Sequence, residues 1–160
     1  AVLLADNDYP FLTRRAQARL NTMRSQWRDL LQMGPLPLRQ EGREWTLYTF
    51  AGDRVNILLA RALALVLGCE VNGDSFALAI KSPAQAALQE GNIWQALEVI
   101  QQPDFFSSER VMAMVRALPR GRLSKFQPLL PPDLEARFLA ERLFDIRGLQ
   151  NWLDEAIGRR

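Results

Sequence analysis

One segment near the middle of the 160-residue chain joins a strand-forming run directly to a helix-forming run. Residues Trp45–Phe50 are rich in β-branched and aromatic side chains, which favour a β-strand. Ala51-Gly52 ends this run, and apolar residues then recur at three- and four-residue steps from Val55 to Val66, before Gly68. The segment predicts a strand, a tight turn and an amphipathic helix in succession, so the fold contains both element types.

A second strand signal follows this helix. Glu70–Ile80 has the pattern of a β-hairpin, and either Asn72-Gly73 or Gly73-Asp74 supplies a pair able to take the positive φ angles of a tight turn. On the other side of the first strand, the polar residues Arg39–Arg43 are expected to form a connector. Strand, helix and hairpin together make a small α+β unit.

Helical periodicity dominates the two remaining parts of the chain. Before the strand, apolar residues at helical spacing predict one helix over Leu12–Gln32, stopped by Gly34-Pro35. Beyond Ser82-Pro83 the chain is helical in character and interrupted by glycines and prolines. The expected helices there are near 83–89, 91–101, 107–118, 132–144 and 146–157.

Two of these later helices carry start signals. Ser107 is a candidate N-cap, and Pro132-Asp133 opens the next helix. In that helix the side chains expected to face inward are Leu134, Phe138, Leu139 and Leu143. The fold class predicted is α+β, a small antiparallel or mixed sheet with packed helices, followed by a helical C-terminal half. The organisation expected is a helix plus a small α+β unit over 1–82 and a helical subdomain over 83–160 packed on it.

The residue types that most enzymes need are scarce. Histidine is absent, which removes the commonest general base and metal ligand, and Cys69 is the single cysteine. No phosphate-cradling glycine loop occurs, so no nucleotide cofactor is expected in this segment. The turn and helix-end carboxylates are more typical of caps than of metal or acid–base sites; they are Asp53, Asp74, Asp104 and Asp145. We therefore expect no catalytic residue and no metal site.

Basic residues are concentrated in two windows. Twenty residues are basic and only two are lysines, so 18 are arginines. Between Asp8 and Asp29, and again between Glu109 and Asp133, there are five basic residues and no acid. Such segregation is typical of a surface that faces nucleic acid, although an arginine bias also follows from base composition of the genome alone.

Three regions supply the candidate nucleic-acid contacts. In the first helix, Arg14, Arg24 and Arg28 fall on the side away from the apolar stripe. At the glycine turn before the second helix, Arg54 could assist a phosphate docked on free N–H groups, or Asp53 could simply cap the helix. In the later basic window the candidate contacts are Arg116, Arg120, Arg122 and Lys125.

The stretch Trp45–Asn56, with Leu58–Leu63 and Phe76–Ile80 after it, resembles the DEAD/H-associated region of bacterial large helicase-related proteins. Tyr9–Leu12 with Leu20–Arg24, and Lys125–Pro131 with Arg142–Asp145, are similar to flanking features of such helicases. The resemblance implies an accessory domain of a superfamily-two DNA helicase, which contacts nucleic acid or braces the motor while ATP is hydrolysed elsewhere in the parent chain. It supplies no catalytic residue for this segment.

The expected function is that of a non-catalytic, cytoplasmic accessory domain cut from a larger chain. Its expected partners are single-stranded or forked DNA and the helicase core domains of the same chain, with no membrane partner. The alternative is a protein-interaction or scaffolding module without nucleic-acid contact, suggested by the apolar residues of the last helices: Leu139, Leu143, Phe144, Leu149 and Trp152.

Overall fold

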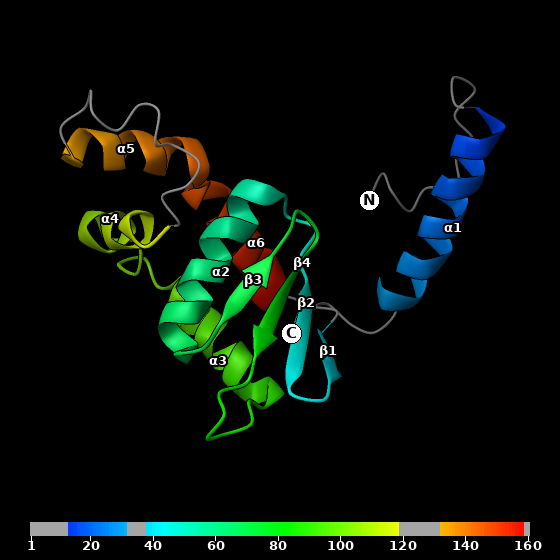
Figure 1. Ribbon diagram of the computed structural model, residues 1–160, viewed down its shortest axis with the longest axis horizontal. Coiled ribbons are helices and arrows are strands. Elements are labelled where there is room, and N and C mark those ends of the chain that lie inside the picture. Colours follow the sequence, from blue (N-terminus) through cyan, green and yellow to red (C-terminus); the bar gives the residue numbers. More distant parts are fainter. Residues whose placement is uncertain (1–12, 32–37, 119–131, 159–160) are drawn as a thin grey trace. The chain divides into compact units, whose positions relative to one another are not determined.

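The computed structural model describes residues 13–31, 38–118 and 132–158 (Figure 1). Contacts divide the chain into two units, Ala1–Pro37 and Leu38–Arg160. The sheet and the helices after residue 83 belong to the same unit, so no boundary falls at 82/83 in this division.

The first unit contains helix α1, Arg14–Leu31, close to the helix predicted over 12–32. Thr13 begins it by accepting a hydrogen bond at its Oγ1 from the backbone N–H of Ala16. Arg14 is exposed on this helix. Arg24, expected to face solvent or a ligand, is instead 4% exposed, and its Nη1 donates to Asn21 Oδ1 at 3.1 Å.

The second unit is built on a four-stranded antiparallel sheet with the order β1-β2-β4-β3. The strands are β1, Leu38–Glu41; β2, Glu44–Tyr48; β3, Val71–Gly73; and β4, Ala77–Lys81. Side chains alternate between buried and partly exposed along β2 and β4. The buried inner face brings together Trp45, Leu47, Val71, Leu78 and Ile80.

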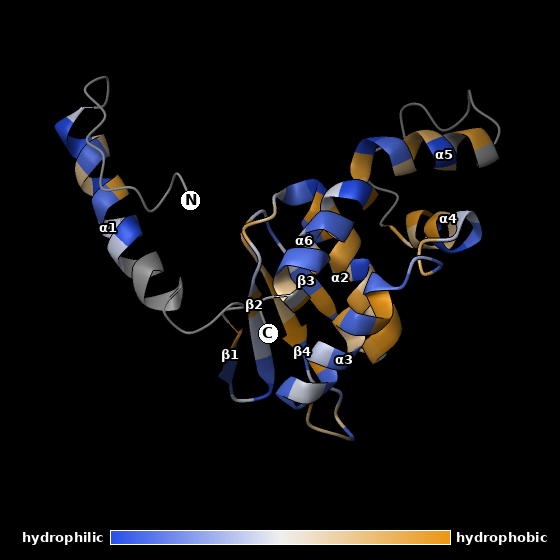
Figure 2. Ribbon diagram, turned by 180° about the vertical axis from the view of Figure 1, so that it is seen from behind, coloured by the Kyte–Doolittle hydropathy of each residue, from blue (hydrophilic) through white to orange (hydrophobic). Residues whose placement is uncertain are grey.

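Helix α2, Asp53–Leu67, packs on this inner face, and the described part of the unit contains five helices (Figure 1). The other four are α3, Glu90–Gln101; α4, Ser108–Arg116; α5, Pro132–Leu143; and α6, Ile146–Gly158. Helix α2 is central, since it touches β3, β4, α3, α5 and α6. Hydrophobic residues concentrate in α2, α3 and β4, where these layers meet (Figure 2). The predicted α+β class, with a small sheet, packed helices and a helical C-terminal half, is confirmed.

The expected connector at Arg39–Arg43 is wrong, because most of it is strand β1. β1 pairs with β2 through a two-residue turn, Gly42-Arg43, in which Gly42 has φ +60°. A positive φ at the first turn residue suits the hairpin turns that match strand twist, and glycine adopts it without strain.

The Glu70–Ile80 hairpin is confirmed, but the turn lies at Asp74–Phe76 rather than at either glycine pair. Asp74 Oδ1 accepts from the N–H groups of Phe76 and Ala77 at 2.8 and 3.0 Å, so this carboxylate forms the turn. Gly73 is a strand residue, and a Cβ on it would come within 2.7 Å of the Ala77 carbonyl oxygen. Close packing, and not a positive φ, therefore explains the glycine.

The expected helix at 83–89 is absent; residues 82–89 form an irregular segment. Arg43 Nη2 donates to the carbonyls of Pro83 and Ala84 at 2.7 and 2.8 Å, and Trp45 Nε1 donates to that of Leu88 at 3.0 Å. Side chains of the β1–β2 hairpin thus occupy carbonyls that a helix would pair internally.

Candidate nucleic-acid interface

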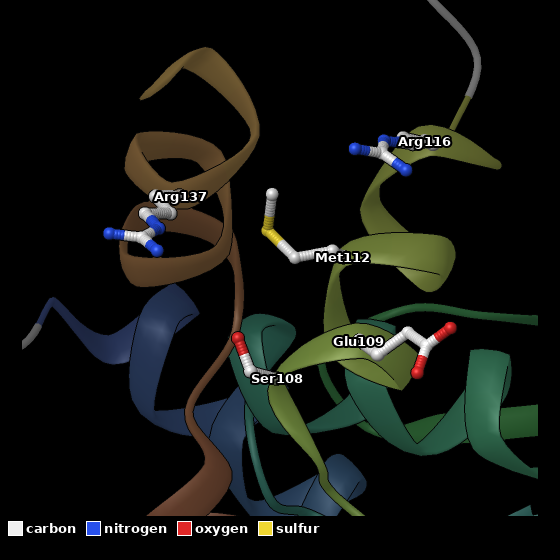
Figure 3. A pocket seen from close by; sticks show the side chains of 5 residues that line it. All are labelled: Ser108, Glu109, Met112, Arg116 and Arg137. Atoms are coloured by element: carbon white, nitrogen blue, oxygen red, sulfur yellow. The ribbon is translucent and has the colours of Figure 1, made fainter. Parts of the chain in front are cut away.

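A groove of about 420 Å³ lies between α4 and α5 (Figure 3). Four of its lining residues come from α4 and one from α5: Ser108, Glu109, Met112, Arg116 and Arg137. The two helices pack directly on each other, so the groove lies along their junction.

Helix periodicity explains why α4 presents these residues. Val111, Met114 and Val115 are buried on one side of the helix. Glu109, Met112 and Arg116 are three and four residues apart, so they share the opposite stripe. The predicted N-cap is confirmed, since Ser107 Oγ accepts from the Arg110 N–H at 3.4 Å.

Arg110 belongs to the same basic window but is used inside the fold. Its Nη1 donates to the Phe105 carbonyl at 2.6 Å, and its guanidinium carbon lies 4.6 Å from the centre of the Phe105 ring. This cation–π contact and hydrogen bond anchor the start of α4 to the preceding turn.

The charges of the groove are arranged along α4. Glu109 is in its first turn and Arg116 in its last, about 10 Å apart along the axis. Each charge is at the helix end whose dipole stabilises it. In Figure 3 the Arg116 side chain extends from α4 toward the α5 side, whereas the Glu109 carboxylate turns away from Met112. Arg137 lies on α5, with its guanidinium turned away from Met112.

Of the contacts predicted from the sequence, Arg116 is thus the one that the described part of the chain places in this groove. The prediction missed Arg137, because Arg137 lies between Glu135 and Glu141 and so outside the acid-free windows. Its position on the flank of the α5 apolar stripe is the signal that would have found it.

Apart from Arg14 and Arg24 of α1, described above, the other predicted contacts divide into two groups. Arg54 is part of the fold: its Nη2 donates to the carbonyls of Glu141 and Phe144 at 2.6 and 2.9 Å. The structure brings Arg54 to the end of α5 and does not place it in the groove. Arg120, Arg122 and Lys125 lie outside the described residues, as does the side chain of Arg28.

The β2–α2 turn, a second candidate for phosphate binding, has a structural role. Asn56 is buried; its Oδ1 accepts from Thr49 Oγ1 and its Nδ2 donates to the Asp74 carbonyl, both at 2.6 Å. Gly52, with φ +86°, is the N-cap residue of α2, so the helix start has no capping side chain from this position. The Asp53 carboxylate accepts from the Ser75 hydroxyl instead of capping the helix. Asp53 places an acid at the start of α2 and Arg54 donates to carbonyls at the end of α5, so neither residue favours a phosphate at this turn. The turn instead joins β2 and α2 to the β3–β4 hairpin.

Outside the groove, the described ranges offer little else for chemistry. No group of three or more Cys, Asp or Glu side chains in them could hold a metal ion. Burial raises the pKa of the Cys69 thiol, which lowers its thiolate fraction at neutral pH. Across those same ranges, none of the helices has the length and apolar character that crossing a bilayer requires.

Comparison with protein-family models, with curated proteins and with solved structures finds no match for this chain.

Proposed function

We propose that this chain is a non-catalytic accessory domain of a DNA helicase, and that it contacts the sugar-phosphate backbone through the groove between α4 and α5. The observation that supports the proposal is the placement of Arg116 and Arg137 on the two helices that border one groove. Guanidinium groups bind phosphate oxygens through two parallel hydrogen bonds, which suits them to this contact.

The sequence between the two helices contains three further basic residues. Arg120, Arg122 and Lys125 fall between Arg116 and Arg137 in the sequence, with no acid before Asp133. Backbone contacts of this kind position a protein without reading sequence. In this proposal the domain works in the cytoplasm beside the ATPase core domains of the same chain, which supply the energy of unwinding.

Salt dependence tests the proposal. We expect Arg116→Ala/Arg137→Ala to weaken binding of labelled single-stranded or forked DNA, and to lower the slope of log affinity against log salt by about 1.5 for single strands. The triple variant Arg120→Ala/Arg122→Ala/Lys125→Ala should lower it by about 2. Fluorescence anisotropy over a salt series measures both.

A matched control removes the same number of charges from the sheet. Arg39 pairs with Glu41 at 3.0 Å and Lys81 with Glu70 at 3.2 Å, and neither cation lines the groove. Arg39→Ala/Lys81→Ala should leave the slope close to that of the parent protein. If the groove variant behaves like this control, the groove does not contact the DNA backbone. If neither the parent protein nor any variant binds DNA at low salt, the proposed function is wrong.

The second candidate function is a protein-interaction module, and one observation favours it. Phe144 and Leu149, which first suggested it, are buried in the core. Leu134 and Phe138 of α5, however, are large apolar residues that remain exposed. Three results together would decide for this function. The chain would associate with a neighbouring domain of its parent, Leu134→Ala/Phe138→Ala would abolish that association, and the chain would not bind DNA at low salt.

A further inference from the structure

Helix α5 exposes an apolar pair that the core does not use. Leu134 and Phe138 were expected to face inward, but their exposed fractions are 54% and 51%. Both project about 160–200° around the helix from Ala136, which is buried against the rest of the unit. The inward side of α5 is therefore centred on Ala136, and the ring of Phe138 lies on the solvent side.

Phe138 lies next to a residue of the groove. Arg137 lines the groove and immediately precedes Phe138, while Leu134 is one turn before both. The side chain of Phe138, with much of its surface open, is thus about 100° around α5 from that of Arg137, a residue that lines the groove. Across the groove stands Arg116, with the thioether of Met112 between the two helices (Figure 3).

We propose that Phe138 is a stacking platform for an unpaired base of a single nucleic-acid strand whose phosphates are held by Arg116 and Arg137. The inference rests on the proposed function and deepens it, because it assigns the strand type and a residue that contacts the base. Sites for single strands combine a positively charged groove with aromatic rings on which bases stack. In a duplex both faces of each base are already stacked, so a lone surface ring has no free base face to contact.

The small size of the apolar pair favours this occupant over a protein. The apolar pair is bordered by exposed charged side chains, namely Arg137, Glu141 and Arg142. A stable protein interface buries about 800 Å² on each partner around an apolar centre. Two apolar side chains within a charged border are too few for such a centre, but one ring is enough for one base.

Substitutions at Phe138 separate stacking from apolar packing. Phe138→Leu keeps an apolar side chain of similar bulk and removes the aromatic face, while Phe138→Trp enlarges that face. We expect Phe138→Leu to weaken binding of a short single strand about five- to tenfold at low salt, with binding of the duplex of the same sequence unchanged. Phe138→Trp should bind the single strand at least as tightly as the parent, with quenching of the new indole.

Phe76→Leu is the matched control, because Phe76 is 44% exposed at the β3–β4 turn and is not a lining residue of the groove. Its affinity for the single strand should equal that of the parent. Circular dichroism and urea unfolding of every variant check that the fold is retained, as expected for side chains with so much exposed surface.

The outcomes distinguish the inference from the proposed function. If Arg116→Ala/Arg137→Ala weakens binding but Phe138→Leu does not, the backbone contact stands and the stacking inference is overturned. The inference is also overturned if Phe138→Leu loses affinity equally for the single strand and the duplex. It is likewise overturned if Phe138→Trp loses affinity for the single strand as Phe138→Leu does. If the parent protein binds neither strand type, both ideas fail together.

Discussion

Asn56 connects three parts of the sheet unit that are separate in the sequence. It lies in the first turns of α2 and is 1% exposed. Through its side-chain amide it joins Thr49, just after β2, to the Asp74 carbonyl at the β3–β4 turn. Among the described residues, every buried side-chain nitrogen and oxygen has a hydrogen-bond partner. An amide is needed at this position because the side chain must accept a hydrogen bond from Thr49 and donate one to the Asp74 carbonyl.

Replacing this amide tests its role. Asn56→Ala removes the acceptor of the buried Thr49 hydroxyl and the donor to the partly buried Asp74 carbonyl, so we expect a loss of about 1–3 kcal/mol in the free energy of unfolding, measured with urea. The control is Asn72→Ala, whose exposed side chain bonds an exposed carboxylate and should change stability by less than about 0.5 kcal/mol. Equal stability of the two variants would contradict the role assigned to Asn56.

Glu70 gives a pH-dependent prediction. Asn72 Nδ2 donates to its Oε1 at 2.7 Å and Lys81 Nζ to its Oε2 at 3.2 Å, and these contacts lower the pKa of Glu70. Because the folded pKa lies below the unfolded one, the contribution of Glu70 to stability is present above the unfolded pKa and disappears as the pH falls through the folded pKa. In an NMR titration the pKa of Glu70 should rise in Asn72→Ala. An unchanged pKa would show that the hydrogen bond from Asn72 does not stabilise the Glu70 carboxylate.

At the scale of elements, contacts between distant segments decide several boundaries. The irregular segment 82–89 has alanines that favour a helix, yet Arg43 and Trp45 bind its carbonyls. Helix α3 begins only at Glu90, where Gln89 and Asn92 form a reciprocal capping box. A local signal for the helix start is therefore present, but it lies after the segment that periodicity alone assigns to a helix.

Two glycines provide a paired test of packing in these elements. At Gly73 an added Cβ would meet the Ala77 carbonyl at 2.7 Å and would also collide with the Leu78 side chain, whereas at Gly91 in α3 it would meet nothing within 4 Å. Gly73→Ala should therefore lower stability by about 1–3 kcal/mol, and Gly91→Ala should leave it unchanged or raise it by up to about 1 kcal/mol. Thermal unfolding measures both; a harmless Gly73→Ala would show that β3 shifts away from β4.

At the scale of the whole molecule, the sheet unit contains the elements of its own core. The strand pairings among the described residues and the buried faces of α2, α3 and α6 come from residues after Pro37. The Leu38–Arg160 unit is therefore expected to fold without residues 1–37 and to unfold cooperatively near the midpoint of the full chain. Urea unfolding followed by circular dichroism and by tryptophan fluorescence checks this. A broad transition, or one that differs between probes, would contradict it.

The sequence by itself determined the elements whose signals are local. The run at Trp45–Phe50, the period of α2 and the glycine after it predict the strand and helix correctly, because side-chain periodicity and a left-handed cap depend on neighbours in the chain. The hairpin over Glu70–Ile80 and the four later helices from α3 to α6 are confirmed for the same reason.

Only the tertiary structure decided where each polar group lies relative to the groove. A charge count treats Arg54 and Arg116 alike, yet Arg54 binds carbonyls nearly ninety residues away while Arg116 borders the groove with Arg137. The same holds for β1, which exists because β2 offers a hydrogen-bonding edge, and for Phe138, which is exposed because α5 packs through Ala136. A hydrogen-bond partner distant in the chain leaves no periodic trace in the sequence, so composition could show where basic residues concentrate but not which of them line the groove.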